Sequence, residues 1–229
     1  MPGKRKEYVV QRVRAGSGEP GMKGAWDGAA WGGVESLEIA CFRPESSGHR
    51  PRTRAKLLYG SGGLFGIFHV EDRYVRCVHS RYMDPVYLDS CVEFFVRPRP
   101  DRGYFNFEFN CGGALLCSYI TDPARTEEGF REYVRLPEED GRRVAIHHSM
   151  PALIDTEIPE AVSWTLEFFL PFPLLEKYAG PLGEMPGARW GANFYKCGDG
   201  TSHPHWAAWS PVDSLNFHLP DCFGTLLFR

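Results

Sequence analysis

Hydrophobic and polar residues alternate without interruption in the segment YFNFEFN, Tyr104–Asn110. Successive side chains of a β-strand point to opposite faces, so this pattern predicts a strand with one apolar and one polar face. The apolar face, Phe105, Phe107 and Phe109, predicts a buried core. The polar face carries a phenol, two amides and a carboxylate, in the order Tyr104, Asn106, Glu108 and Asn110. These residues form either a solvated surface or a binding site.

Similar strand-like segments, separated by turn residues, recur along the chain. Residues 55–59 and 64–70 flank the sequence GSGG, and a glycine-rich connection of this length is typical of a hairpin. We expect further strands at 91–96, 104–110, 114–119, 143–148, 163–169, 190–196 and 223–228. A short helix is predicted at 173–178, with proline in its first turn and Gly180 after its end. Because few helices alternate with the strands, the sequence predicts an all-β fold, an antiparallel, jelly-roll-like β-sandwich with one or two short helices.

Length and composition favour one domain. A chain of 229 residues is ordinary for a single large β-sandwich, so we expect one domain over residues 1–229. Residues 42–54 are rich in Pro, Ser, Gly and Arg, and residues 121–142 are charged and poorly periodic. Both segments are therefore predicted to be loops.

The charge balance restricts the class of partner. Lys and Arg number 26 against 29 acidic residues, a formal net charge of -3, which argues against nucleic acid and against an anionic membrane surface. No apolar run approaches the ~18 residues that a membrane span requires. Neutral or weakly polar ligands fit this composition better.

The cysteines and the first residues bear on location. Seven cysteines are present, an odd number without a CxxC pair, which favours free, buried thiols in a reducing compartment. The start, MPGKRKEYVVQRVRAG, is basic but lacks the apolar stretch of a secretory signal. These features favour a cytoplasmic location, and an extracellular one applies if the sequence is a trimmed piece of a longer protein.

Several motifs occur in a recognisable order. After Trp26 and Trp31 come LLYGSGGLFGIFHVEDR, DSCVEFFVRP, YFNFEFN, SWTLEFFLPF, RWGANFYKCGD, AAWSP and PDCFGTLLFR. This succession resembles the family 9 carbohydrate-binding modules and the related DOMON-like β-sandwiches, from about Trp26 to Phe228. The resemblance rests on the order and spacing of the pieces, since each piece alone is short. It implies a module that clamps a terminal sugar between two aromatic side chains, while polar strand residues bind the hydroxyl groups.

The family's binding positions can be carried over residue by residue. The two aromatic positions fall on Tyr87 and Phe217, where the family members in question have tryptophan. The carboxylate of the DSCVEF strand falls on Glu93. Glu108 stands where the family has arginine, so an acceptor replaces a donor. The resemblance implies these ligand-binding residues: Tyr87, Glu93, Asn106, Glu108, Asn110, His203 and Phe217. It also implies that Trp209 belongs to the core.

The chemistry of these side chains suits a sugar. An aromatic ring can cover the C–H face of a pyranose, and amides and carboxylates can bind its hydroxyls. A carboxylate that accepts a hydroxyl hydrogen contributes ~1.5–3 kcal/mol, so binding of a mono- or oligosaccharide in the micromolar to millimolar range is expected. The residues alone leave another interpretation open, in which the polar face meets water and Tyr87 and Phe217 cap the core.

Two catalytic or cofactor-dependent functions compete with simple binding. Glu93 and Glu108 on adjacent strands could act as the carboxyl pair of a glycosidase. Some DOMON-like domains hold haem, and the conceivable ligands here are Met83, Met150, Lys196 and His203. The chain matches no glycosidase signature, so we expect a protein without enzymatic activity. A separate glycoside hydrolase is a conceivable partner.

No metal site can be assigned from the sequence. Cys197, His203 and His205 are soft ligands, but their spacing is not that of a compact zinc motif, and a fourth ligand is not evident. We therefore expect the segment KCGDGTSHPHW, residues 196–206, to line the sugar cleft instead. No cofactor is expected to be required. A structural calcium ion stays open, with loop oxygens from Asp27, Asp72 and Asp199 as candidates.

Overall fold

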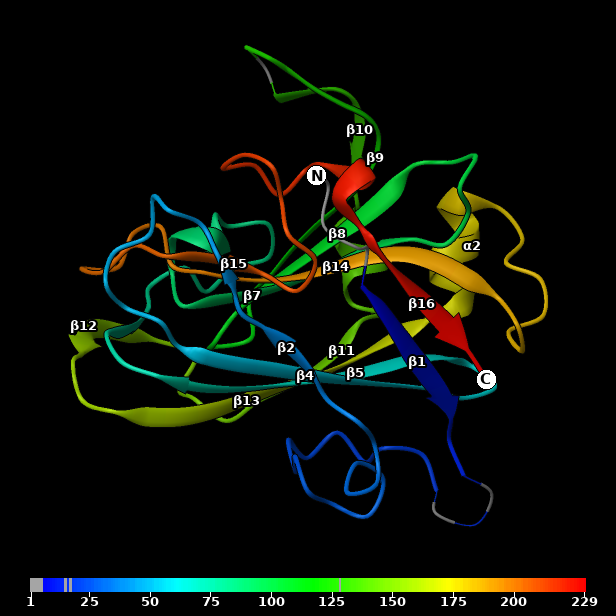
Figure 1. Ribbon diagram of the computed structural model, residues 1–229, viewed down its shortest axis with the longest axis horizontal. Helices are drawn as coiled ribbons and strands as arrows, with labels where there is room; N and C mark the ends of the chain where they lie inside the picture. The colour runs from blue at the N-terminus through cyan, green and yellow to red at the C-terminus, as the bar shows by residue number, and fades with distance from the viewer. Residues whose placement is uncertain (1–5, 15, 17, 128) are drawn as a thin grey trace.

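The computed structural model describes residues 6–14, 16, 18–127 and 129–229, and it consists mainly of two β-sheets packed face to face (Figure 1). The first sheet has the order β10 (Gly129–Arg135), β9 (Leu115–Thr126), β8 (Tyr104–Asn110), β7 (Cys91–Arg97), β14 (Arg189–Cys197) and β16 (Gly224–Phe228). The second has the order β4 (Arg52–Tyr59), β5 (Gly63–Asp72), β13 (Val162–Pro171) and β11 (Ala145–His148). Neighbouring strands within each of these two series are antiparallel.

One strand joins the two sheets. β1 (Glu7–Arg12) pairs in parallel with β16 on one side and with β4 on the other. Short strands extend the sheets: β2 (Leu37–Ile39), β3 (Cys41–Phe42) and β15 (Trp206–Ala208). β6 (Val75–Cys77) and β12 (Ile154–Ile158) form a separate ribbon. The all-β antiparallel sandwich predicted from the sequence is confirmed.

The helical segments are short. The α-helices of the described chain are α1 (Glu138–Gly141) and α2 (Phe172–Ala179), and 3₁₀ turns occur at η1 (Val86–Leu88) and η2 (Pro220–Cys222). α2 has proline in its first turn and ends at Gly180, whose φ of 79° is a conformation that glycine adopts readily. None of the described helices has the length and apolar character needed to cross a membrane.

The core lies between the sheets. Phe107 and Phe109 of β8 point inward and belong to the main core cluster, as their alternation predicts. Phe109 stacks against Phe168 of β13 with ring centroids 5.4 Å apart. Trp209 is buried in the same cluster, as the family resemblance implied. All seven cysteines are free, and five of them are buried.

The structure shows that the prediction of a loop over residues 121–142 is wrong for most of this segment. It was expected to be a loop, but β9 continues to Thr126 and β10 returns beside it as an antiparallel hairpin. Figure 1 shows this hairpin projecting beyond the rest of the sandwich. Its residues are exposed or half-buried on both faces, so the sequence lacks the alternation that marks a strand with one buried face.

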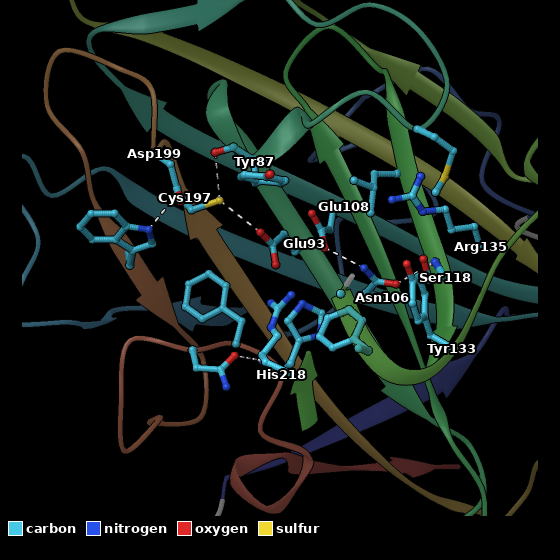
Figure 2. Close-up of a pocket in the computed structure, with 18 of the residues that line it drawn as sticks. Tyr87, Glu93, Asn106, Glu108, Ser118, Tyr133, Arg135, Cys197, Asp199 and His218 are labelled. Carbon is cyan, nitrogen blue, oxygen red and sulfur yellow. Dashed lines mark hydrogen bonds between the residues drawn. The ribbon is translucent and has the colours of Figure 1, made fainter. Parts of the chain in front are cut away.

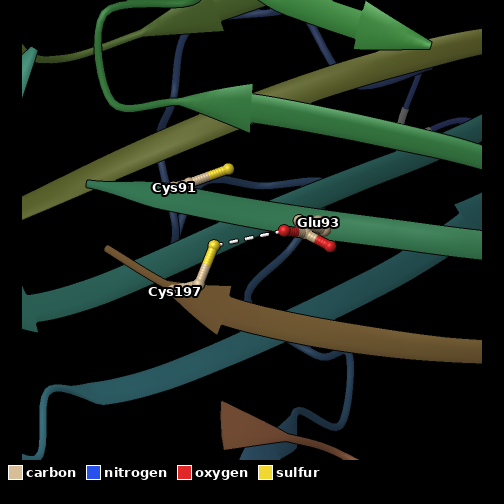
Figure 3. A group of neighbouring side chains, drawn as sticks. All are labelled: Cys91, Glu93 and Cys197. Atoms are coloured by element: carbon tan, nitrogen blue, oxygen red, sulfur yellow. Dashed lines mark hydrogen bonds between the residues drawn. The ribbon is translucent and has the colours of Figure 1, made fainter. Parts of the chain in front are cut away.

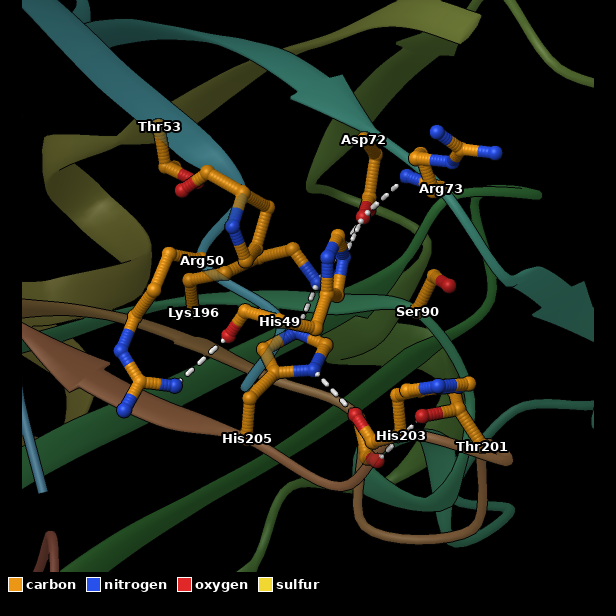
Figure 4. Close-up of polar contacts among 12 residues, drawn as sticks. His49, Arg50, Thr53, Asp72, Arg73, Ser90, Lys196, Thr201, His203 and His205 are labelled. Carbon is orange, nitrogen blue, oxygen red and sulfur yellow. Dashed lines mark hydrogen bonds and ion pairs between the residues drawn. The ribbon is translucent and has the colours of Figure 1, made fainter. Parts of the chain in front are cut away.

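A buried polar network lies between the sheets (Figure 4). The ammonium group of Lys196, 3.4 Å from Asp72 Oδ2, donates to Nε2 of His205 at 2.8 Å. His49 lies 2.8 Å from Asp72 Oδ1. Burial lowers the pKa of His205 to about 3, so its imidazole is neutral and can accept the lysine proton. Lys196 faces the space between the sheets because it lies two positions after the core residue Phe194 in β14, and side chains two positions apart in a strand share a face.

Candidate functional site

A cavity of about 540 Å³ lies over the outer face of the first sheet (Figure 2). Its floor comes from β7, β8, β9 and β14. Its walls come from the β9–β10 hairpin, from η1 and from the loops around 199–206 and 215–218. The polar or charged lining residues are Glu93, Asn106, Glu108, Ser118, Arg125, Arg135, Asp199, Asn216 and His218, and the rings are Tyr87, Phe130, Tyr133, Trp206 and Phe217.

The register of the floor strands places the polar groups together. Glu93 is the direct partner of Glu108 between β7 and β8, and Asn106 is the partner of Ser118 between β8 and β9. Asn106 donates from Nδ2 to Glu108 Oε1 at 2.8 Å. The backbone N–H of Ser118 donates to Asn106 Oδ1 at 2.7 Å. The amide of Asn106 is therefore held in one orientation, with its NH₂ group directed to the carboxylate.

The two floor carboxyls are unusual for acidic groups because both are nearly inaccessible. Burial raises the pKa of Glu108 from 4.5 to about 7, although the hydrogen bond from Asn106 opposes this. Burial also raises the pKa of Glu93 well above its usual range, and the nearby Cys197 and Glu108 add to the effect. Among the described residues, Oε2 of Glu93 has no hydrogen-bond partner. A ligand that donates a hydrogen bond would satisfy this oxygen.

A third carboxyl lies on the wall formed by the loop after β14. Asp199 Oδ1 accepts a hydrogen bond of 2.8 Å from the indole Nε1 of Trp206, which also lines the cavity. Burial raises the pKa of Asp199 to about 6. The sequence analysis expects the segment 196–206 to line the cleft, and these two residues of the segment do line the cavity, although the pattern of a loop does not indicate which of its side chains turn toward a distant strand.

Two aromatic walls differ in how firmly they are held. Tyr87 on η1 is 39% exposed and lines the cavity. Phe217 stacks on the buried Tyr195 with centroids 4.0 Å apart and an interplanar angle of 11°. The hydroxyl of Tyr195 donates to the carbonyl of Phe217 at 2.9 Å, which fixes the loop as well as the ring. Tyr87 is therefore a free surface for a ligand, whereas one face of the Phe217 ring is already used.

The β9–β10 hairpin supplies the remaining wall, which the sequence analysis missed. Phe130 and Tyr133 pack edge to face, with centroids 5.5 Å apart. The guanidinium of Arg125 lies over the Phe130 ring at 4.1 Å, a cation–π contact. Arg125 and Arg135 bring positive charge to a cavity whose floor is acidic.

Beneath this wall, Tyr104 supports the cavity without lining it. Its hydroxyl lies 2.9 Å from Nδ1 of His218. Burial lowers the pKa of His218 to about 3, so the neutral imidazole accepts the phenol hydrogen. His218 is thereby positioned at the edge of the cavity (Figure 2).

Five of the seven residues predicted to bind sugar line the cavity: Tyr87, Glu93, Asn106, Glu108 and Phe217. Asn110 does not, although it shares a face with Glu108. Its Nδ2 donates to the His79 carbonyl at 2.6 Å and to Asp89 at 3.0 Å, and its Oδ1 accepts from the N–H of Ala114. The expectation that Asn110 contacts ligand is therefore withdrawn, because its polar atoms hold the turn after β8.

His203 also lies apart from the cavity. Its ring stacks on Tyr74 with centroids 3.6 Å apart, and its Nδ1 lies 2.8 Å from the Ser202 hydroxyl. The loop turns it toward the end of β5 and away from the floor strands. The expectation that His203 donates to a sugar is withdrawn for this reason.

The conceivable haem and calcium ligands are likewise dispersed. Met83 lines the cavity, whereas Lys196 points between the sheets and is engaged by Asp72 and His205. The three aspartates considered for calcium have different partners: Asp27 lies 3.8 Å from Lys56, Asp72 contacts Lys196, and Asp199 contacts Trp206.

Comparison with known proteins identifies a family and a fold. The sequence profile of carbohydrate-binding family 9 matches residues 32–228. A presumed carbohydrate-binding protein from Bacteroides uniformis ATCC 8492 superposes with a TM-score of 0.83 at 28% identity, over 99% of this chain and 100% of that one. No curated protein matched the chain significantly.

Two more distant structures show the same fold. A family 9 module from Caldicellulosiruptor kristjanssonii in complex with cellotriose superposes with a TM-score of 0.64 at 15% identity, over 98% of this chain and 94% of that one. A family 9 module from the same organism in complex with glucose gives 0.62 at 15% identity, over 98% and 96%. These matches support the family 9 part of the resemblance and give no support to its DOMON-like part.

Proposed function

The chain belongs to carbohydrate-binding family 9, and we propose that its cavity holds a terminal sugar ring without catalysing a reaction. The observation that carries this proposal is the cavity over the polar face of β8, with acidic and amide groups on its floor and aromatic rings on its walls. A volume of about 540 Å³ is sufficient for one or two sugar rings. The sugars in the two family 9 complexes make glucose and cello-oligosaccharides the first ligands to test.

Each part of the cavity has a role in this proposal. The ring of Tyr87 covers the C–H face of the sugar. Glu108 and the free oxygen of Glu93 accept hydrogens from hydroxyl groups, while Trp206 adds a second apolar face beside Asp199. Because Glu108 replaces a cationic donor of the family, the hydroxyl that meets it acts as donor. The preferred sugar therefore differs in orientation or stereochemistry from one that meets an arginine.

Isothermal titration calorimetry with glucose, cellobiose and a panel of other mono- and disaccharides tests the proposal. We expect micromolar to millimolar dissociation constants for at least one sugar. Asn106→Ala leaves Glu108 without its donor and the Ser118 N–H without its acceptor, so affinity should fall by about tenfold or more. His203→Ala is the control, since His203 lies outside the cavity, and its affinity should match that of the wild type. Absence of binding across the panel would contradict the proposal.

The non-catalytic part of the proposal rests on the placement of the carboxyl groups. A glycosidase positions its two carboxyls on either side of the scissile bond. Glu93 and Glu108 instead emerge side by side from one face of one sheet. Incubation with aryl glycosides should therefore release no chromophore. Release that disappears in Glu93→Gln would establish catalysis and overturn this part.

A further inference from the structure

Three buried side chains with metal-binding atoms, two of which line the cavity, meet on neighbouring strands of the first sheet (Figure 3). Cys91 and Cys197 are direct partners in the register between β7 and β14, and Glu93 follows two positions after Cys91 on the same face. One ligating atom from each residue lies within 4.8 Å of those of the other two. The exposed fraction of each residue is 2% or less.

The present contacts of these groups are few. The thiol of Cys197 donates to Glu93 Oε1 at 3.1 Å and lies 3.8 Å from the carbonyl of Tyr87. The thiol of Cys91 lies 3.7 Å from the carbonyl of its neighbour Val92, and it also interacts with the thiol of Cys197. Oε2 of Glu93 is buried without a hydrogen-bond partner among the described residues. A buried oxygen that lacks a hydrogen-bond partner and lies beside two thiols is a set of donor atoms that a metal ion can satisfy.

The donor set selects the kind of ion. Thiolate is a poor ligand for Ca²⁺ and Mg²⁺, which take oxygen ligands, but it is a strong one for Zn²⁺. Tetrahedral zinc has Zn–S distances of about 2.3 Å and Zn–O distances of about 2.0–2.2 Å, which separates its ligand atoms by about 3.4–3.8 Å. The three groups can reach this geometry through side-chain movements of about 1 Å or less, because their atoms already lie within 4.8 Å.

We propose that Cys91, Glu93 and Cys197 form a zinc site with three protein ligands and a fourth position open to the cavity. Glu93 and Cys197 line the cavity, and Cys91 lies beside them on the same face of the sheet, where it packs with Val86 and Ala114, so the open position would face the space where a ligand would lie. Water or a ligand hydroxyl would occupy it. On binding, two thiol protons and any proton on the carboxyl pass to solvent, and no oxidation or reduction occurs. With zinc bound, a sugar hydroxyl would meet the open position of the metal in place of the Glu93 oxygen, but the metal site is built from protein groups alone and does not depend on sugar binding.

Cobalt is the probe of choice, because Co²⁺ reports thiolate ligation directly. The full chain, reduced and freed of metal by a chelator, is titrated anaerobically with Co²⁺. We expect one equivalent to produce thiolate-to-cobalt charge-transfer absorption and the intense visible bands of tetrahedral cobalt, and Zn²⁺ to abolish both. Cys91→Ser and Cys197→Ser each keep one thiolate, so each should lower the charge-transfer absorption by about half or more, and the double variant should lose it. Glu93→Gln should keep it but bind at least about tenfold more weakly.

The matched control is a second pair of buried cysteines. Cys77 and Cys111 lie close enough for their thiols to interact, and they lie outside the proposed site. Cys77→Ser should therefore bind Co²⁺ as the wild type does. Circular dichroism establishes that each variant is folded.

X-ray absorption of the zinc-loaded wild type keeps the proposal testable if a serine variant does not fold. Two sulfur scatterers and one or two oxygen scatterers are expected. Fewer than two sulfurs, or no cobalt bands in the wild type, would overturn the proposal. So would bands of wild-type intensity in both serine variants, or mass mapping that finds Cys91 and Cys197 joined as a disulfide in the isolated protein.

Discussion

Glu93 on β7 and Glu108 on β8 are direct cross-strand partners, and both line the floor of one cavity. The Cβ atoms of such partners lie about 4.5–5.5 Å apart, so two carboxylates here would repel each other. Burial raises the pKa of both groups, that of Glu108 to about 7. The floor of the cavity therefore holds at least one carboxyl proton below neutral pH, and its charge changes within the physiological range.

The first prediction concerns the pH dependence of stability. The folded state binds the Glu108 proton more tightly than the unfolded state does, because the pKa is raised from 4.5 to about 7. This contribution to stability is fully present below about pH 4.5 and is lost as the pH rises through 7. Glu108→Gln removes this pH dependence, so the stability of the variant relative to the wild type should rise between pH 4.5 and pH 7, by up to about 3 kcal/mol. Urea unfolding at pH 5, 6, 7 and 8 measures the difference, and a difference independent of pH would refute the assignment.

The second prediction separates binding from stability at the two aromatic walls. Tyr87 is exposed, so Tyr87→Ala should lower sugar affinity by about tenfold and change the free energy of unfolding by less than about 0.5 kcal/mol. Phe217 stacks on Tyr195, so Phe217→Ala should lower both affinity and stability, the latter by about 1–3 kcal/mol. Calorimetry and urea unfolding of both variants provide the measurements. If both variants lose the same stability, the stacking of Phe217 on Tyr195 does not stabilise the fold more than the exposed ring of Tyr87 does, and the prediction is wrong.

The third prediction concerns the buried network between the sheets. Lys196→Met leaves the carboxylate of Asp72 buried without its ammonium partner, which should cost about 3–5 kcal/mol of unfolding free energy. A second substitution, Asp72→Asn, removes the uncompensated charge and should restore part of the loss. Arg142→Met is the control, because its salt bridge with Glu138 is exposed and contributes about 0.5 kcal/mol or less. A double variant less stable than Lys196→Met would contradict this account.

The fourth prediction concerns the β9–β10 hairpin. Its exposed Arg131 is a site for trypsin, and its inner side lines the cavity. A sugar that contacts Phe130 and Tyr133 should hold the hairpin closed, so cleavage there should slow at saturating ligand. Mass spectrometry of timed digests measures the rate. Protection should be lost in Asn106→Ala at the same sugar concentration, and equal rates with and without sugar would show that the ligand does not reach the hairpin.

Much of the fold follows from local sequence pattern. The alternation in β8 predicted its strand and its core face, because burial of one face imposes a period of two on the side chains. The hairpin of β4 and β5 was also predictable, because a short glycine-rich connection between two apolar segments is typical of a hairpin. β10 was not predicted, because a hairpin that projects beyond the sandwich has no buried face to impose that period.

The site was only partly predictable, because its walls depend on contacts between distant segments. Glu93 and Glu108 followed from motif order and strand register. The segment 196–206 was expected to line the cleft, but no local pattern indicates that Asp199 and Trp206 are the side chains of this segment that reach the cavity. Asn110 shares the predicted face but meets a different neighbouring segment, around Asp89, so its position on the strand did not determine its role.

The parallel pairing of β1 with β16 determines how the molecule responds to mechanical load. Tyr8 pairs with Leu226 and Val10 with Phe228, so the first strand runs beside the last in the same direction. Tension between the two ends of the chain therefore pulls these strands past each other, and their hydrogen bonds share the load in shear instead of opening one at a time. The edge that joins the two sheets is thus also the part of the molecule that resists extension.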